Sequence, residues 1–298
     1  MKEEKILLPN GISMNVVHSL SEKPAILFLH FSGGTWQAWH GVIPHFSAEY
    51  SVIAPDIRGH GKSEKPESGY HIDEMAEDII LLLNGLGIEC CHIIGSSMGA
   101  EVGLSIAASH PEMVKSLVCE GGLYDRWGEY SLIDGTKEEA DIERTELLAS
   151  IINEEELVFS SAEEYLSSME KEFKEAEIWN RHAEAFSRST MEQRGKGQFA
   201  NRFKKNVLAG FISSCWDIRL EDYYRKMSCP VLFLPSQEES EDRLAEKSIK
   251  HFSSLLREYY KIYIPNSLHA YVWLQFPFQA AEAVKSFYKS LKTGRLSV

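Results

Sequence analysis

A glycine–serine motif between an apolar run and a helix-like run constrains this sequence more than any other feature. The motif is Gly95-Ser96-Ser97-Met98-Gly99, with the spacing G-x-S-x-G. The preceding residues, 91–94, are typical of a short buried strand, and residues 100–108, rich in small side chains, are typical of a helix. A strand, a tight turn and a helix in this order hold the central serine in a strained conformation, with glycines providing clearance. We therefore expect Ser97 to stand exposed at a strand end as a candidate nucleophile.

Strand-like and helix-like runs alternate on both sides of this motif. The sequence predicts strands at 12–17, 25–30, 51–56, 116–119, 230–234 and 260–264, and helices at 72–86, 243–257 and 278–292. Such alternation is typical of an α/β fold. We therefore expect a mostly parallel sheet with helices on both of its faces.

The pattern changes within residues 123–228. Strand-like runs disappear there, and apolar residues recur at helical intervals. Ser161 and Glu164 have the spacing of a capping box that opens one of the helices. The sequence predicts a core domain formed by residues 1–122 and 229–298, with 123–228 as a helical cap, or lid, inserted between two core strands. Such a lid is expected to cover the strand ends and to enclose a mostly apolar pocket.

Charge and cysteine content limit the partners and the compartment. The 298 residues carry a formal net charge of −13, which disfavours nucleic acids and anionic membranes as partners. No apolar run approaches the roughly 20 residues that span a bilayer, and no signal peptide is visible. The five cysteines form no CxxC pair, which favours buried free thiols in a reducing compartment. We therefore expect a cytoplasmic protein with a small-molecule substrate, while the oligomeric state is not indicated.

An exposed serine needs a base to take its proton and an acid to orient that base. His269 follows the predicted strand 260–264, at the sheet edge where open α/β sheets place their sites, and is the predicted base. The acid is expected after the strand that ends at Leu234. Glu239 is favoured there by its distance past the strand, among four carboxylates at Glu238, Glu239, Glu241 and Asp242. Glu120, at the end of the strand that follows the motif, is the alternative acid.

The oxyanion formed by nucleophilic attack needs two preorganised N–H donors. The backbone N–H of Met98, directly after the candidate nucleophile, is one predicted donor. The N–H of Ser32, in the loop Phe31-Ser32-Gly33-Gly34, is the other. No phosphate loop, dinucleotide fingerprint or metal-binding motif occurs, and the pair His40 and His45 has no supporting ligand pattern. We therefore expect no cofactor and no metal.

These segments resemble the α/β-hydrolase fold family over nearly the whole chain. Residues 29–34 are similar to the His-Gly loop of that family, and residues 56–63 to its D-x-R-G-x-G-x-S turn. The serine motif and the late histidine complete the match. The resemblance implies an α/β-hydrolase fold and assigns the nucleophile, acid and base roles to Ser97, Glu239 and His269.

The resemblance also narrows the reaction. A serine rather than an aspartate nucleophile argues against haloalkane dehalogenase and epoxide hydrolase activity, while the Ser-Met-Gly sequence and the cap are similar to those of carboxylesterases and carbon–carbon bond hydrolases. We expect a serine hydrolase that cleaves a small or medium carboxylic ester through an acyl-enzyme on Ser97. The alternatives are a carbon–carbon bond hydrolase of a diketone-type substrate, a perhydrolase or acyltransferase, and a hydrolase-fold protein that binds a ligand without turnover.

Overall fold

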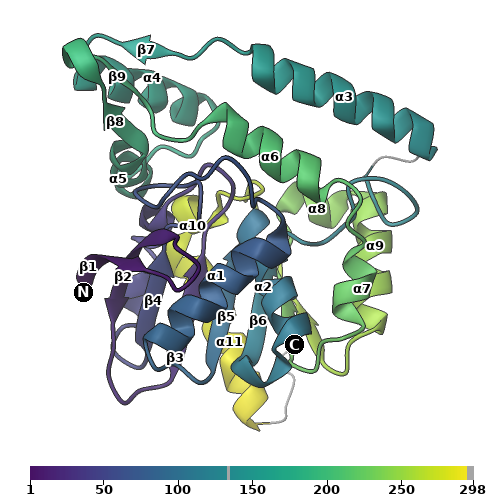
Figure 1. Cartoon of the computed structure of the whole chain (residues 1–298). Helices are drawn as coiled ribbons and strands as arrows, with labels where there is room; N and C mark the ends of the chain where they lie inside the picture. The colour runs from purple at the N-terminus through teal and green to yellow at the C-terminus, as the bar shows by residue number, and fades with distance from the viewer. Residues whose placement is uncertain (133–134, 294–298) are drawn as a thin grey trace.

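A twisted eight-stranded sheet forms the centre of the computed structural model, which describes residues 1–132 and 135–293 (Figure 1). The strand order is β1-β2-β4-β3-β5-β6-β10-β11. All neighbours from β4 to β11 pair in parallel, whereas β1 and β2 pair antiparallel at one edge. The fold therefore confirms the prediction of a mostly parallel sheet.

The strands fall on the apolar runs of the sequence, apart from β1, which the sequence did not predict, and the run 260–264 overlaps β11 only at 260–261. Their bounds are β1 (Lys2–Leu7), β2 (Ser13–Ser19), β3 (Ala25–Leu29), β4 (Ser51–Pro55), β5 (Cys91–Ser96), β6 (Val114–Glu120), β10 (Val231–Phe233) and β11 (Tyr259–Lys261). The main helices of the core are α1 (Ile72–Gly85), α2 (Met98–Ser109), α9 (Arg243–Ser254) and α11 (Pro277–Thr293), with the short α8 (Gln237–Glu241) and α10 (Val272–Gln275) near the strand ends.

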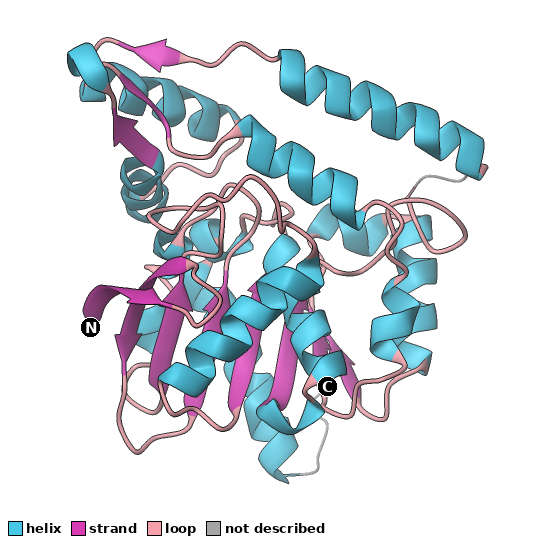
Figure 2. Cartoon of the chain, in the orientation of Figure 1, coloured by secondary structure: helices cyan, strands magenta, loops and turns pink. Residues whose placement is uncertain are grey.

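Both faces of the sheet are covered, which explains why its central strands are apolar throughout. Every residue of β3 is buried. Leu27 and Leu29 pack into the hydrophobic core that includes α1 and α2, while Ile26 and Phe28 pack into the core that includes α11. A parallel strand covered on both faces has no polar side, so its sequence loses the usual alternation. Figure 2 shows α1 and α2 on one side of the sheet and α11 on the other.

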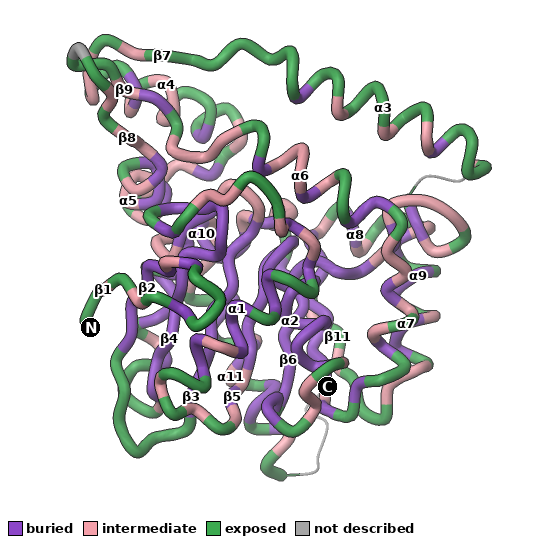
Figure 3. The backbone as a smooth tube through the Cα atoms, in the orientation of Figure 1, coloured by how far each residue is buried: buried purple, intermediate pink, exposed green. Residues whose placement is uncertain are grey.

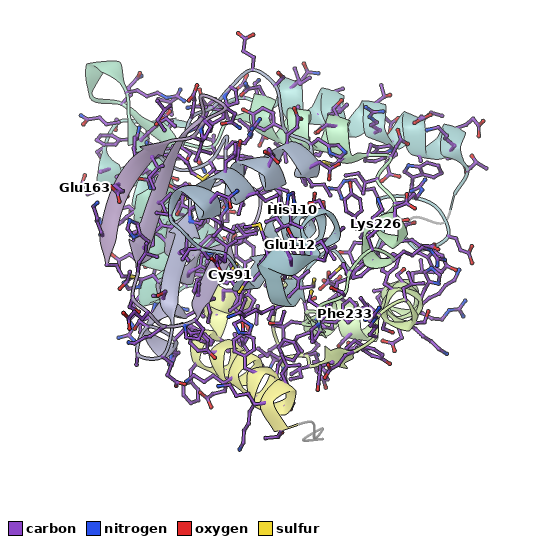
Figure 4. All side chains as sticks on the ribbon, turned by 60° about the horizontal axis from the view of Figure 1, so that its bottom comes forward. Cys91, His110, Glu112, Glu163, Lys226 and Phe233 are labelled. Carbon is purple, nitrogen blue, oxygen red and sulfur yellow. The ribbon has the colours of Figure 1, made fainter. Side chains whose placement is uncertain are left out.

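Burial follows this layered arrangement. The central strands β3, β4, β5 and β6 are almost continuously buried in Figure 3, whereas most of the edge strand β1 and most of α3 (Lys137–Asn153) are exposed. Cys91 and Phe233 lie inside the molecule, and Glu163 lies at its outer edge (Figure 4). All five cysteines are free thiols, and four of them are buried. Among the described residues, no helix is both long and apolar enough to cross a membrane.

The segment between β6 and β10 lies mostly above the carboxyl ends of the strands (Figure 1). It contains α3, α4 (Ala162–Glu175), α5 (Arg181–Thr190), α6 (Lys205–Cys215) and α7 (Leu220–Tyr224). However, α7 packs against α2 and α9, and its residues Leu220 and Tyr224 belong to the core of the main sheet. The predicted boundaries of the lid, 123–228, stay a prediction. Residues 133–134 and 294–298 of the predicted domains lie outside the described residues.

The expectation that this insertion lacks strands is wrong. Three short strands, β7 (Val158–Phe159), β8 (Met191–Gln193) and β9 (Phe199–Asn201), form an antiparallel sheet in the order β7-β9-β8. Strands of two or three residues are too short to produce a recognisable alternation. The capping box also forms only in part: Ser161 Oγ accepts the N–H of Glu164, but the Glu164 carboxylate accepts the N–H of Ser160 instead.

Two glycines let α2 start directly against the ends of the central strands. A Cβ at Gly99 would lie 2.1 Å from the carbonyl oxygen of Leu29, at the end of β3. A Cβ at Gly95 would lie 2.5 Å from Cα of Ala100. Both neighbours are backbone atoms, which cannot move aside as a side chain can. The two glycines of the motif are therefore required by close backbone approach.

Gly99→Ala is expected to lower the free energy of unfolding by about 2 kcal/mol or more, because the added methyl group overlaps the backbone of β3. Gly85→Ala, at the end of α1, is the matched control, since nothing lies within 4 Å of a Cβ there. The control should be neutral or raise stability by up to about 1 kcal/mol, as alanine restricts the unfolded chain. Urea unfolding followed by circular dichroism measures both changes. Equal stability of the two variants would contradict the assigned backbone contact.

Candidate active site

Ser97 occupies a strained turn between β5 and α2. Its backbone has φ 49° and ψ −119°, a region that non-glycine residues rarely adopt. Its N–H donates to the carbonyl oxygen of Glu120, and its own carbonyl accepts the N–H of Ala100 at 2.9 Å. A Cβ at Gly121 would lie 2.5 Å from Cα of Ser97. The end of β6 therefore closes tightly on the turn, and Gly121 is a requirement that the sequence pattern did not reveal.

His269 lies beside this serine. Its Nε2 is 3.1 Å from Ser97 Oγ, although the two residues are 172 positions apart in the chain. The loop that carries His269 is tied to α8, because Gln237 accepts the N–H of Asn266 at 2.6 Å and donates its own N–H to the carbonyl of Ser267 at 3.2 Å. The structure thus brings the predicted nucleophile and base within hydrogen-bond distance.

Two carboxylates face the other nitrogen of the same imidazole. Glu239 Oε1 lies 3.1 Å from His269 Nδ1, and Glu120 Oε1 lies 3.6 Å from it. The N–H at Nδ1 does not point at either carboxylate oxygen, so neither contact is a hydrogen bond. Both are ion-pair contacts when the imidazole is protonated. Imperfect alignment of this kind is common before a substrate binds. Distance alone favours Glu239 as the partner of the histidine.

Glu239 is buried and held by three further hydrogen bonds. Its Oε2 accepts the N–H of Ser236 at 2.9 Å, and the N–H of Glu239 donates to Ser236 Oγ at 3.2 Å, which completes a capping box at the start of α8. Its Oε1 accepts the hydroxyl of Tyr124 at 2.9 Å. Burial alone would raise the pKa of Glu239, but contact with His269 and the Ser236 N–H outweigh it and lower the pKa to about 2. Glu239 is therefore a carboxylate at neutral pH.

Glu120 is the other carboxylate, and its surroundings differ. In the pairing of β5 with β6, it lies directly beside Ser96. It accepts hydrogen bonds from the hydroxyl of Ser96, from the Ala270 N–H at 2.6 Å and from Trp273 Nε1 at 3.3 Å. Burial raises the pKa of Glu120 to about 7, against the opposing effects of the His269 charge and the Ser96 hydroxyl. Three donors and complete burial fix this carboxyl group in place beside the histidine loop.

The charge of His269 follows from these two neighbours. Burial on its own would lower the pKa of this imidazole. Contact with Glu239 and the negative charges of Glu120 and Glu239 outweigh that effect and raise the pKa to about 9. In the substrate-free protein the imidazolium is therefore the favoured form at neutral pH.

A cavity of about 510 Å³ opens at Ser97 and His269. Its wall combines residues that follow β6 with apolar residues of α6. Besides the serine and histidine it is lined by Met98, Glu101, Gly121, Gly122, Tyr124, Asp125, Arg126, Leu132, Leu208, Phe211 and Ile212. In the wall of this cavity, the guanidinium of Arg126 and the carboxylate of Glu101 form a bidentate ion pair, with N–O distances of 3.1 and 3.2 Å.

The two predicted oxyanion donors line different cavities. Met98 lines the cavity at Ser97, whereas Ser32 lines a neighbouring cavity of about 670 Å³, whose wall comes mostly from the insertion and combines aromatic with charged side chains. Leu208 of α6 contributes to both. Phe31, in the same loop as Ser32, packs against Phe186 and Tyr271. Among the described residues, the N–H groups of Ser32 and Met98 donate to no other group of the chain.

Sequence reasoning missed several residues of this site. Tyr124, Ser96 and Trp273 donate hydrogen bonds to the two carboxylates. Tyr124 and Trp273 belong to no motif, and Ser96 stands at a variable position of the serine motif, so its residue type carried no signal. Ser236 was recognisable, because Ser236 and Glu239 have the spacing of a capping box, which distinguishes Glu239 from its acidic neighbours. Within residues 1–132 and 135–293, no group of three or more His, Cys, Asp or Glu side chains could hold a metal ion.

Comparison with known sequences identifies relatives over part of the chain. A soluble epoxide hydrolase of Corynebacterium sp. (strain C12) is 37% identical over 108 residues, which are 36% of this chain and 37% of that relative. The match thus spans little more than a third of the length of the curated relative.

Two solved structures are similar over almost the entire chain. E-2-(acetamidomethylene)succinate hydrolase has a TM-score of 0.77 at 22% identity and covers 97% of this chain and 99% of its own. A thermophilic esterase from Thermogutta terrifontis has a TM-score of 0.71 at 19% identity and covers 98% of this chain and 100% of its own. At such identities the likeness concerns the fold. The sequence model of the alpha/beta hydrolase fold matches residues 24–234, and this chain therefore belongs to the alpha/beta hydrolase fold family.

Proposed function

We propose that this protein, a member of a hydrolase family, is a serine hydrolase that cleaves carboxylic esters through an acyl-enzyme. The observation that carries the proposal is the contact of 3.1 Å between Ser97 Oγ, held in a strained turn, and His269 Nε2. His269 takes the proton of Ser97 as the hydroxyl oxygen attacks the ester carbonyl. The same histidine then gives that proton to the departing alkoxide. Water, deprotonated by His269, attacks the acyl carbonyl and regenerates the serine.

Glu239 is the proposed acid of the triad. It is the nearer of the two carboxylates to His269 Nδ1, and its low pKa keeps it ionised. A negative charge at this position stabilises the imidazolium that forms during attack and keeps the ring oriented. Glu120 is assigned a positioning role, because it lies farther from His269 Nδ1, at 3.6 Å, and accepts the N–H of Ala270, the residue after the histidine.

The backbone N–H groups of Ser32 and Met98 are the proposed oxyanion donors. Their freedom from other partners among the described residues supports this role, since a donor aimed at a transition state must not be engaged elsewhere. The two cavities, which share Leu208 in their walls, are of a size that favours a small or medium substrate.

The chemistry of a serine nucleophile argues against epoxide hydrolysis, although a relative carries that name. Attack of Ser97 Oγ on an epoxide carbon would open the ring and leave an ether between serine and substrate. An ether has no carbonyl for water to attack, so Ser97 would stay alkylated and the enzyme would be inactive after a single reaction. An ester carbonyl instead gives an acyl-enzyme that water can cleave, which makes an ester the better substrate for this site.

Ser97→Ala is expected to lower kcat/KM for aryl esters by about 10⁴- to 10⁶-fold while the protein remains folded, because the acyl-enzyme can no longer form. A fluorophosphonate probe should label Ser97, as located by mass spectrometry of the labelled peptide. Ser96→Ala is the matched neighbour and should retain labelling. Labelling at Ser96, or substantial activity of Ser97→Ala, would refute the assignment of the nucleophile.

Glu239→Gln is expected to reduce kcat by about 10³- to 10⁴-fold, since the carboxylate that orients and stabilises the His269 ring is lost. Glu238→Gln, an exposed position on the same short helix, serves as the control and should remain within a factor of two or so of the native rate. Steady-state ester hydrolysis measures both. If Glu120→Gln abolishes activity while Glu239→Gln is mild, the acid role belongs to β6.

The pH profile of kcat/KM provides a test of Glu120. His269 must be neutral to accept a proton, so its raised pKa predicts that activity increases as the pH rises through about 9. Glu120→Gln removes a negative charge that favours the imidazolium, and the inflection should move to lower pH by about one pH unit. Rates corrected for hydroxide hydrolysis measure the shift. An unchanged or higher inflection would show that Glu120 does not influence the charge of His269.

A further inference from the structure

The Arg126–Glu101 ion pair is the most unusual feature of the cavity at Ser97. Glu101 lies one helical turn after Ser97, on the same face of α2, because its N–H bonds to the Ser97 carbonyl. Arg126 follows β6 and meets Glu101 with both terminal nitrogens. The side chains are only 22% and 11% exposed. A charged pair is therefore built into the wall of the cavity one turn from the nucleophile.

Arg126 has hydrogen-bonding capacity that Glu101 does not use. A guanidinium carries five N–H donors. Within the described part of the chain, the guanidinium donates two hydrogen bonds, both to Glu101, and Phe211 covers one of its faces, with the guanidinium carbon 5.0 Å from the ring centroid. The ring and the ion pair fix the orientation of the fork. Because Arg126 lines the cavity, its remaining N–H groups are available to an acceptor that enters there.

The charges around the cavity disfavour an anionic ligand. Glu101 already neutralises Arg126, and the wall also includes Asp125. Glu120 and Glu239 stand directly behind His269. A substrate carboxylate would have to compete with Glu101 and would approach these other carboxylates. A neutral acceptor, such as an amide carbonyl, can accept a free N–H of Arg126 and leave the pair intact.

We propose that the Arg126–Glu101 pair selects esters that carry an uncharged hydrogen-bonding group, such as an amide, within a few bonds of the scissile carbonyl. The inference rests on the proposed ester hydrolysis at Ser97 and specifies its substrate class. The pair recognises the polar group as a dipole: Arg126 donates to its oxygen, and Glu101 can accept an N–H or O–H from it. Apolar and anionic substituents of the same shape gain neither contact.

Three phenyl esters of equal shape test this selectivity on the acyl side. N-acetylglycinate carries the neutral amide, 4-methylpentanoate is its apolar counterpart, and hemisuccinate is the anionic one. Acetate esters of the three corresponding alcohols test the leaving-group side. For each variant, kcat/KM of the amide ester is divided by kcat/KM of the apolar ester and by that of the anionic ester. Comparing each ratio between variants removes the intrinsic reactivity of the esters, because that reactivity is the same for every variant.

Glu101→Gln/Arg126→Met removes both charges together, so that neither is left buried without its partner. This double variant should lower the ratio of amide to apolar ester about tenfold in one of the two series, the value of one lost hydrogen bond. Arg126→Lys, which keeps the charge but loses the fork, should lower it by a smaller factor. Glu184→Gln/Arg188→Met, which removes an exposed ion pair on α5, is the matched control and should leave the ratio unchanged.

The proposal is overturned if the folded double variant keeps the native ratio of amide to apolar ester in both series. It is also overturned if the native protein prefers the hemisuccinate. Circular dichroism and thermal unfolding verify the fold, and Arg126→Lys provides the same readout if the double variant does not fold. Hydrolysis of the apolar ester together with labelling of Ser97 tests the proposed function separately. Absence of both would reject ester hydrolysis and, with it, this inference.

Discussion

The close approach of α2 to the ends of the central strands is the constraint on which the site depends. It is possible because Gly95 and Gly99 have no side chains to collide with Ala100 and Leu29. Once α2 starts there, Ser97 must turn through a conformation that few residues adopt, and its hydroxyl lies beside His269. The end of β6 closes on the same turn through Glu120 and Gly121.

Much of this arrangement could be predicted from the sequence, because parallel strands deliver their carboxyl ends to one edge. Ser97 and His269 each follow a predicted strand, and they meet at that edge. The choice between two carboxylates was harder, since Glu120 and Glu239 both follow strands beside the same histidine. The small sheet in the insertion and the pairing of Arg126 with Glu101 could not be predicted, because tertiary packing alone creates them.

The two carboxylates give the histidine an environment that neither would provide alone. Glu239 is supported by polar donors from Ser236 and Tyr124 and stays ionised, while Glu120 is buried among donors that fix its position. Glu239 supplies the nearer charge, and Glu120 adds to that charge and also holds the backbone of the histidine loop through the Ala270 N–H. Such a division of labour resembles paired carboxylates in other enzymes, where different surroundings assign different tasks to chemically equal groups.

Glycines line the core side of the cavity at Ser97, and a Cβ at Gly121 or Gly122 would meet Ser97 or Leu104 closely. The core therefore contributes a floor that tolerates almost no variation in side chains. Residues 124–126 and α6 supply the chemically distinctive wall, and α6 also shapes the adjoining cavity through Leu208. Most residues that can alter specificity on this scaffold therefore lie in one contiguous stretch of the gene, with Glu101 of α2 as an exception, and this stretch can diverge while Ser97 and His269 stay in place.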